Sequence, residues 1–453
     1  MCYNDSNFDK ELIKRIYKMV KGFEAAVDRL YLKLDSIYHK CHIVFDIVFY
    51  GCLILFFSIA IVNDWENTIR TKVLLNSYVK SAVWTMDHYL LPILAGTTLL
   101  FEFKNKKSRI IVFLCIYILM LYQINAEQFI VGVIPHCATY YFGVGCLMIA
   151  AKGRDFQRIG WICVALHVLF MITITIFSVA GLAQDVVTIE YGRVNRHSFG
   201  MFHALTYSVH WLSAVLLYCY LKDGFLRWWD YVWIGIITCI SALACKAQTS
   251  TILLCILLFG SIMRRISKHQ ESKSQRFAKI KEGISHVLEW SFGIMAGIMI
   301  LGSSLYNILI LPIVKKIPAL GTFGARFYFG HKALQSYFPT TLGAQYQTIL
   351  GDRADAFYID CGYIEILVRC GVVVFLIVMF ALEYNMHQLA QKHRRYALFI
   401  LTLLAVSCAM EAHLLNISCN PFLLLTFAVI SVKQANNEEC GNIVKKIETA
   451  VEL

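Results

Sequence analysis

Residues 42–62 read HIVFDIVFYGCLILFFSIAIV, an apolar run with one charged side chain, Asp46. Similar runs recur along the 453-residue chain, which is 58% hydrophobic and 16% charged, with a mean hydropathy of +0.60. A soluble domain is closer to about 45–50% apolar and about 25% charged. A run of about 20 apolar residues crosses a lipid core of about 30 Å, where the backbone must be helical to satisfy its own hydrogen bonds. The sequence therefore predicts an all-α, polytopic integral membrane protein.

The apolar runs predict about 12 transmembrane helices, with a large extracytoplasmic loop between spans 9 and 10. Residues 230–263 should form a hairpin of two of these helices that breaks near Lys246. The other ten spans are expected at 42–62, 82–102, 109–124, 128–151, 159–183, 199–221, 284–308, 364–384, 396–412 and 421–433. The expected organisation is a cytoplasmic basic amphipathic helix (1–41), spans 1–9 (42–308), an extracytoplasmic catalytic loop (309–363), spans 10–12 (364–433) and a cytoplasmic tail (434–453).

Lysine and arginine set the expected orientation. The net charge is +12, but the basic clusters lie between apolar runs, as in cytoplasmic loops, so nucleic acid is not an expected partner. Both termini and the basic segments should face the cytoplasm; those segments are 104–109, 152–158, 264–281 and 392–395. The loops 63–81, 184–198 and 309–363 should then face outward.

The N-terminal segment 9–41 is basic and has apolar residues at alternating spacings of three and four. This pattern predicts an amphipathic helix. Two interpretations stay open. The helix forms a coiled coil with a partner, or it lies on the inner leaflet with its cationic side chains against membrane lipid.

The longest polar departure from the apolar pattern covers residues 321–374 and begins GTFGARFYFGHKALQSYF. Arg326 and Lys332 would lie on partly overlapping faces of a helix, and Asp355 and Tyr358 follow later. A carboxylate beside cationic groups in an apolar setting is a candidate general base, and aromatic faces suit sugar rings. The alternative is a solvated loop with ordinary ion pairs.

A second cluster lies where an outer loop enters the sixth predicted span. It contains Arg193, Arg196, His197 and His203. Two guanidinium groups three residues apart suit an anion such as phosphate, because arginine stays charged and donates in pairs. The alternative is that these arginines only reach toward lipid headgroups.

Other motifs are absent. The 16 cysteines include no CxxC pair, so the sequence predicts no zinc site. No P-loop or HExxH motif occurs either, and we expect no bound metal and no cofactor. Two pairs near outer helix ends, Asp87–His88 and Glu411–His413, could line one cavity. Isolated polar residues inside spans are expected to be satisfied by neighbouring helices: His136, His167, His210 and Glu289.

Four segments, in this order, resemble motifs of Wzy-type polysaccharide polymerases in the O-antigen ligase/polymerase family. They are RHSFGMFHA (196–204), KAQTSTILL (246–254), GARFYFGHKAL (324–334) and ADAFYIDCGYIEILVRCGVV (354–373). The resemblance implies a glycosyltransferase in the cytoplasmic (inner) membrane of a bacterium. It would transfer a growing glycan from polyprenyl pyrophosphate to a new lipid-linked repeat unit, without metal.

In that reaction a diphosphate leaves, so arginines should be the main source of electrostatic stabilisation. The resemblance implies that Arg196 and Arg326 hold the pyrophosphate, assisted by Arg193, and that Asp355 or His203 acts as base or orients the acceptor. His197, Lys332 and Tyr358 complete the expected substrate contacts. The polyprenyl-pyrophosphate-linked oligosaccharide is the expected partner, with a flippase and a chain-length regulator as further candidates.

Three alternatives stay open. Ligase-type transfer differs only in the acceptor. A transporter of polysaccharide or lipid-linked oligosaccharide should show internal repeats and a charged central path. The chain shows no convincing repeat, and its charges concentrate at one outer face, which favours the enzyme. A receptor or scaffold acting through the N-terminal helix would leave the arginines without a role.

Overall fold

The computed structural model describes residues 6–65, 77–103, 108–112, 136–190, 193–270, 283–317, 321–336 and 359–429. These residues are mostly helical. The first half holds α1 (Ser6–Asn63), α3 (Ser77–Thr85), the π-helix η1 (Met86–Leu90), α4 (Leu91–Phe101), α6 (His136–Ala150), α7 (Phe156–Val179), β1 (Thr188–Glu190), β2 (Arg193–Arg196) and α8 (Ala204–Leu221). The second half holds α9 (Trp228–Leu243), α10 (Gln248–Gln270), α12 (Ser291–Ser304), the π-helix η2 (Tyr306–Ile310), α13 (Leu311–Lys316), α14 (Gly321–Ser336), α15 (Gly362–Arg369), α16 (Gly371–Gln391), α17 (Arg395–Met410) and the 3-10 helix η5 (Pro421–Thr426).

The membrane character of the chain is confirmed in its coarse form. Among the described residues, five helices are long and apolar enough to cross a bilayer, or six if a pair bent by 59° is one span. The five are Lys40–Asn63, Phe156–Val179, Ala204–Leu221, Gln248–Ile266 and Gly371–Gln391, and the bent pair is Gly283–Glu289 with Ser291–Ser304. The prediction of about 12 spans stays a prediction, and residues 113–135, within predicted spans 3 and 4, lie outside the described part of the chain.

Several predicted spans are interrupted, for identifiable reasons. Pro92, inside the predicted span 82–102, follows the π-helical turn η1, because proline lacks the N–H that continues a helix. Pro312 follows η2 in the same way, just beyond the predicted span 284–308. Gly371 has φ +84° and separates α15 from α16 inside the predicted tenth span. The predicted twelfth span starts with only the six-residue η5. The predicted polar loop 184–198 contains the antiparallel β1–β2 hairpin, so the described fold is not purely α-helical.

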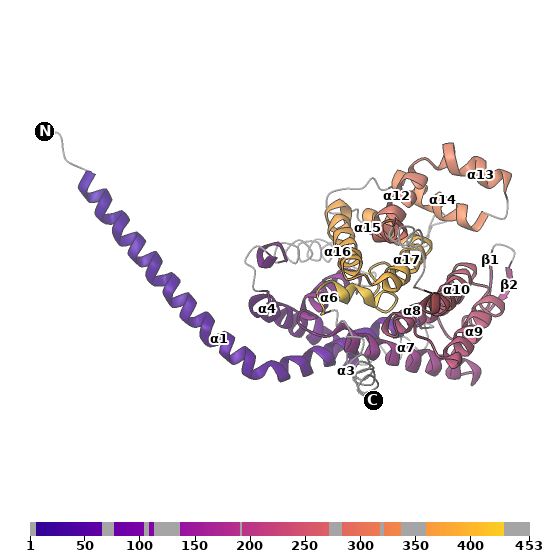
Figure 1. Cartoon of the computed structure of the whole chain (residues 1–453), viewed down its shortest axis with the longest axis horizontal. Coiled ribbons are helices and arrows are strands. Elements are labelled where there is room, and N and C mark those ends of the chain that lie inside the picture. Colours follow the sequence, from indigo (N-terminus) through magenta and orange to yellow (C-terminus); the bar gives the residue numbers. More distant parts are fainter. Residues whose placement is uncertain are drawn as a thin grey trace, which may run out of the picture.

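The predicted amphipathic helix and first span are one continuous helix, α1, of 58 residues. Its N-terminal half projects away from the other helices (Figure 1). Whether that half meets a partner or a lipid surface stays a prediction.

Ion pairs join the basic loops at one end of the helical body. Arg154 pairs with Asp46 at 3.0 Å, and Arg264 pairs with Asp223 at 2.7 Å. Arg394 also contacts Asp223, and Gln157 donates to the Leu221 carbonyl. We call this the basic end. Three of the segments predicted to share a face, 152–158, 264–281 and 392–395, contribute residues to it.

The opposite end, which we call the site end, begins at the end of α1. Asp64 lies 18 residues beyond Asp46, a rise of roughly 27 Å along a helix, close to a bilayer core. There Trp65 bridges to Met201, and the Phe202 amide donates to the Asp64 carbonyl at 2.9 Å. The helix α14 joins this end by close packing on α12 (Figure 1).

The contact between α12 and α14 depends on two glycines. A Cβ added at Gly302 would lie 2.4 Å from the Phe327 ring, and one at Gly330 would lie 2.3 Å from Ser303 Oγ. Each helix therefore packs a side chain directly against a glycine of the other, and this close contact helps to position Arg326, the neighbour of Phe327.

Replacing Gly302 with Ala should therefore destabilise the protein by about 1–3 kcal/mol, because the Phe327 ring must shift. Gly297→Ala in the same helix is the matched control, since nothing lies within 4 Å of its added Cβ. The control should be neutral or stabilising by up to about 1 kcal/mol, because alanine favours a helix. Thermal unfolding of both variants in detergent tests this, and equal midpoints would contradict it.

Candidate functional site

The site end is built around an irregular segment, residues 411–420, between α17 and η5. The helix α17 stops at Met410, and Glu411 has extended backbone angles. Side chains replace the lost helical bonds: Asn416 Oδ1 accepts from the Ser418 amide, and Asn420 Nδ2 donates to the Leu414 carbonyl. Most of the segment is buried, so its non-helical backbone must find hydrogen-bond partners inside the protein.

Arg326 on α14 reaches this segment. Its side chain is only 6% exposed and pairs with two carboxylates. One is Asp360, just before α15, and the other is Glu411, whose Oε1 lies 3.5 Å from Arg326 Nη2. Because a buried guanidinium needs compensating charge, this pairing explains how Arg326 is tolerated there.

Arg196 ends strand β2 and is 1% exposed. Its Nε donates to the Cys245 carbonyl at 3.2 Å. Glu411 lies outside the five candidate spans, and its pKa is raised to about 7. Burial is the largest cause and raises the pKa, as does the nearby Asp360 charge. The charges of Arg326 and Arg196 act in the opposite direction and lower the pKa. Both predicted arginines therefore act on one carboxyl group, although 130 residues separate them in the sequence.

A second carboxylate orients the loop that carries Arg196. Asp185 Oδ2 lies 2.6 Å from His197 Nδ1, and Asp185 Oδ1 accepts from the amides of Ser198 and Phe199 at 2.8 and 2.9 Å. Burial acts to raise the pKa of Asp185, but these hydrogen bonds outweigh it and hold the pKa below its ordinary value. His197 is thus engaged in positioning the loop.

Asp185→Asn should lower stability by about 1–3 kcal/mol at neutral pH, because the amides lose a charged acceptor. The folded-state pKa of Asp185 is lowered, so its stabilisation is complete above about pH 4 and is lost as pH falls through the folded value. Thermal midpoints of both proteins between pH 7 and pH 3 should converge at the acid end. A difference in thermal midpoint that stays constant with pH would contradict the role of ionised Asp185 in holding the loop.

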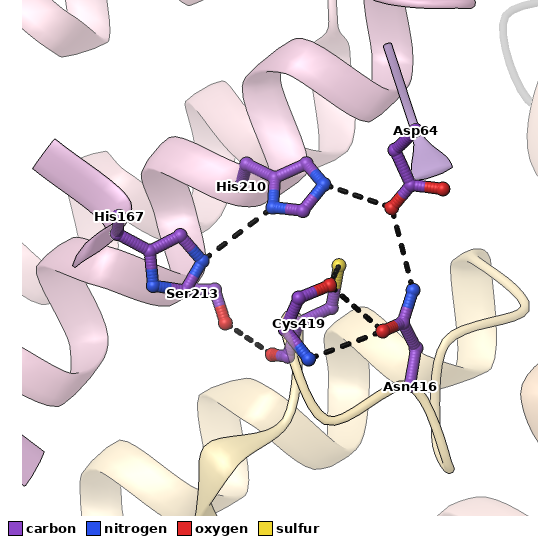
Figure 2. Close-up of polar contacts among 7 residues, drawn as sticks. Asp64, His167, His210, Ser213, Asn416 and Cys419 are labelled. Carbon is purple, nitrogen blue, oxygen red and sulfur yellow. Dashed lines mark hydrogen bonds and ion pairs between the residues drawn. The ribbon is translucent and has the colours of Figure 1, made fainter. Parts of the chain in front are cut away.

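A row of polar side chains extends from the site end into the bundle. Figure 2 shows Asp64, His210 on α8 and His167 on α7 in line. His210 Nε2 lies 2.9 Å from Asp64 Oδ2, and its Nδ1 lies 3.4 Å from His167 Nε2. Both histidines are fully buried. As expected from the sequence, His210 has partners on neighbouring elements, whereas His167 contacts His210 through Nε2 and its buried Nδ1 has no hydrogen-bond partner among the described residues.

The same region gathers three potential metal ligands. One ligand atom each from Asp64, His210 and Cys419 lies within 4.8 Å of the others. Cys419 belongs to segment 411–420, and Asn416 from that segment donates to Asp64 Oδ2 at 3.4 Å. The sequence gave no sign of this group, because no spacing motif connects its members.

The remaining predicted site residues have varied positions. His203 is the N-cap of α8, where its Nδ1 accepts from the Leu205 amide at 3.1 Å. Lys332 lies on α14 and is half-buried. The side chain of Arg193 and all of Asp355 and Tyr358 lie outside the described residues, so their predicted roles stay predictions.

The sequence pattern assigned no role to two members of the site, Asp360 and Asp64. Asp64 lies in the loop 63–81 that is predicted to face outward. Glu411 was noted only as one of a pair near a helix end. An aspartate at the exact end of an apolar run, as in Asp64–Trp65, was the available signal.

Comparisons with known proteins add no relative: no protein-family model, no curated protein and no solved structure matches this chain.

Proposed function

We propose that the protein polymerises polyprenyl-pyrophosphate-linked oligosaccharide repeat units into a surface polysaccharide. The observation that carries the proposal is the burial of two arginines at the site end, Arg196 and Arg326, of which Arg326 pairs with Glu411. Burial of two permanent cations is costly unless an anion balances them. Asp360 and Glu411 balance Arg326 in the structure, and a diphosphate is an anion that would take the place of Glu411.

The charges of this cluster suit an exchange of anions. Glu411 contacts Arg326 at the long distance of 3.5 Å, whereas the Asp360 contact is closer. An incoming diphosphate would therefore replace Glu411 and leave Asp360 to orient the guanidinium. In the transfer step the glycosidic bond to phosphate breaks and negative charge grows on the leaving diphosphate. Two guanidinium groups stabilise that charge in a low-dielectric site.

The other assignments of the proposal rest on the sequence resemblance. Asp355 or His203 takes the proton of the acceptor hydroxyl or orients the acceptor, and Tyr358, His197, Lys332 and Arg193 contact substrate. The site end faces the outside of a bacterial cytoplasmic membrane, with both termini inside. No nucleotide sugar is needed, because the lipid diphosphate is already an activated donor.

Arg326→Lys should reduce transfer by about 10²–10³-fold, since lysine keeps the charge but loses paired donation. The measurement is the ladder of longer glycans formed in proteoliposomes supplied with lipid-pyrophosphate-linked repeat units. Arg154→Lys is the matched control, because Arg154 is equally buried and also paired with an aspartate, but at the basic end. The control should keep the ladder.

The same assay distinguishes the alternatives. A ladder abolished by Arg326→Lys and by Arg196→Lys supports polymerisation. Transfer to a different acceptor without a ladder would indicate a ligase. Lipid that moves between leaflets without transfer would indicate a transporter, a class that also uses interrupted helices with buried polar side chains, as in segment 411–420. Full activity of both arginine variants would refute the diphosphate site.

The proposal also predicts a pH dependence of substrate binding. The pKa of Glu411 is raised to about 7, so it is mostly neutral below that pH and anionic above it. Anionic Glu411 competes with diphosphate for Arg326, so KM for the lipid donor should rise as pH increases from about 6 to 8. In Glu411→Gln this rise should be absent. Because both proteins are assayed with the same substrate, an equal pH dependence of KM in the two would contradict competition between Glu411 and diphosphate.

A further inference from the structure

We propose that Asp64, His210 and Cys419 bind one thiophilic divalent cation of the zinc class. This site does not rest on the proposed glycan transfer and lies outside the arginine cluster. Carboxylate oxygen, imidazole nitrogen and thiolate sulfur are the three ligand types that zinc takes in proteins. Here they come from the end of α1, the middle of α8 and segment 411–420.

The geometry needs only a small adjustment. A tetrahedral zinc ion holds N, O and S ligands about 3.3–3.5 Å from one another. The present ligand atoms lie within 4.8 Å, and Asp64 Oδ2 and His210 Nε2 are already 2.9 Å apart. Side-chain rotations of Asp64 and Cys419 close the remainder. Three protein ligands leave the fourth position for water.

Hydrogen-bonding groups around the three ligands hold them in place, as the partners of metal ligands do in known metal sites. His167 Nε2 faces His210 Nδ1 and fixes the imidazole with Nε2 toward Asp64. Asn416 holds the Asp64 carboxylate, and Ser213 on α8 donates to the Cys419 carbonyl (Figure 2). The backbone around Cys419 is therefore fixed before any ion arrives.

The charge balance favours a divalent ion in this buried place. With the ion bound, one carboxylate, one thiolate and one neutral imidazole sum to −2 and cancel the charge of the cation. Binding releases the thiol proton of Cys419 to water, and the proton that His210 Nε2 shares with Asp64 moves to His210 Nδ1, which faces His167 Nε2. A monovalent or a trivalent ion would leave net charge, which is costly in a low-dielectric interior. The bound ion would tie α1, α8 and segment 411–420 together.

The test is cobalt titration of the full-length, metal-stripped protein in detergent, because thiolate-bound Co²⁺ gives a charge-transfer absorption band. The wild type should show a saturable band equivalent to one cobalt per chain, and zinc should displace it. Cys419→Ser should abolish the band. Cys408→Ser, a change at another fully buried cysteine, is the matched control and should keep it. The assay contains no glycan substrate, so its outcome is independent of transferase activity.

A second, milder variant keeps the test informative if Cys419→Ser does not fold. His167→Gln removes no ligand but changes the partner of His210, and it should weaken cobalt binding by about 10–100-fold. Absence of a saturable band in the wild type would overturn the proposal, as would an unchanged band in Cys419→Ser.

Discussion

A guanidinium buried between two carboxylates joins the separate parts of the site end. Arg326 from α14 pairs with Asp360 before α15 and with Glu411 after α17. Removing one partner of a buried ion pair costs about 3–5 kcal/mol, because the remaining charge is left uncompensated. The three elements are therefore held in one arrangement by charge as well as by apolar packing. The same need for compensation is the physical basis of the anion site proposed beside Arg326.

The second constraint is the backbone of segment 411–420. Where α17 stops, its carbonyls and the following amides lose their helical partners and must find others inside the protein. Asn416 and Asn420 supply them with short side chains. Because no helix occupies this space, polar side chains from α8 and the end of α1 can meet there. The interruption thus creates the polar interior in which both clusters lie.

Local patterns in the sequence predicted much of this molecule and failed at specific places. The apolar runs predicted a helical membrane protein. Arg196 and Arg326 drew attention because they lie in loops that are predicted to face outward. The helices end at other residues than the predicted spans where one residue outweighs hydropathy, as at Gly371 with its φ of +84°. The partners of Arg326 could not be predicted, since pairing with Glu411 spans 85 residues and depends on packing of α14 against α12. A mixed metal-ligand group drawn from three distant segments has no sequence signature.

Segment 411–420 belongs to both clusters, and this links their positions. Its first residue, Glu411, contacts Arg326, and its ninth, Cys419, lies beside Asp64 and His210. Hydrogen bonds within the segment make it rigid between these points. The position of Cys419 is therefore coupled to that of Glu411, the partner of Arg326, even though the two clusters have different chemistry.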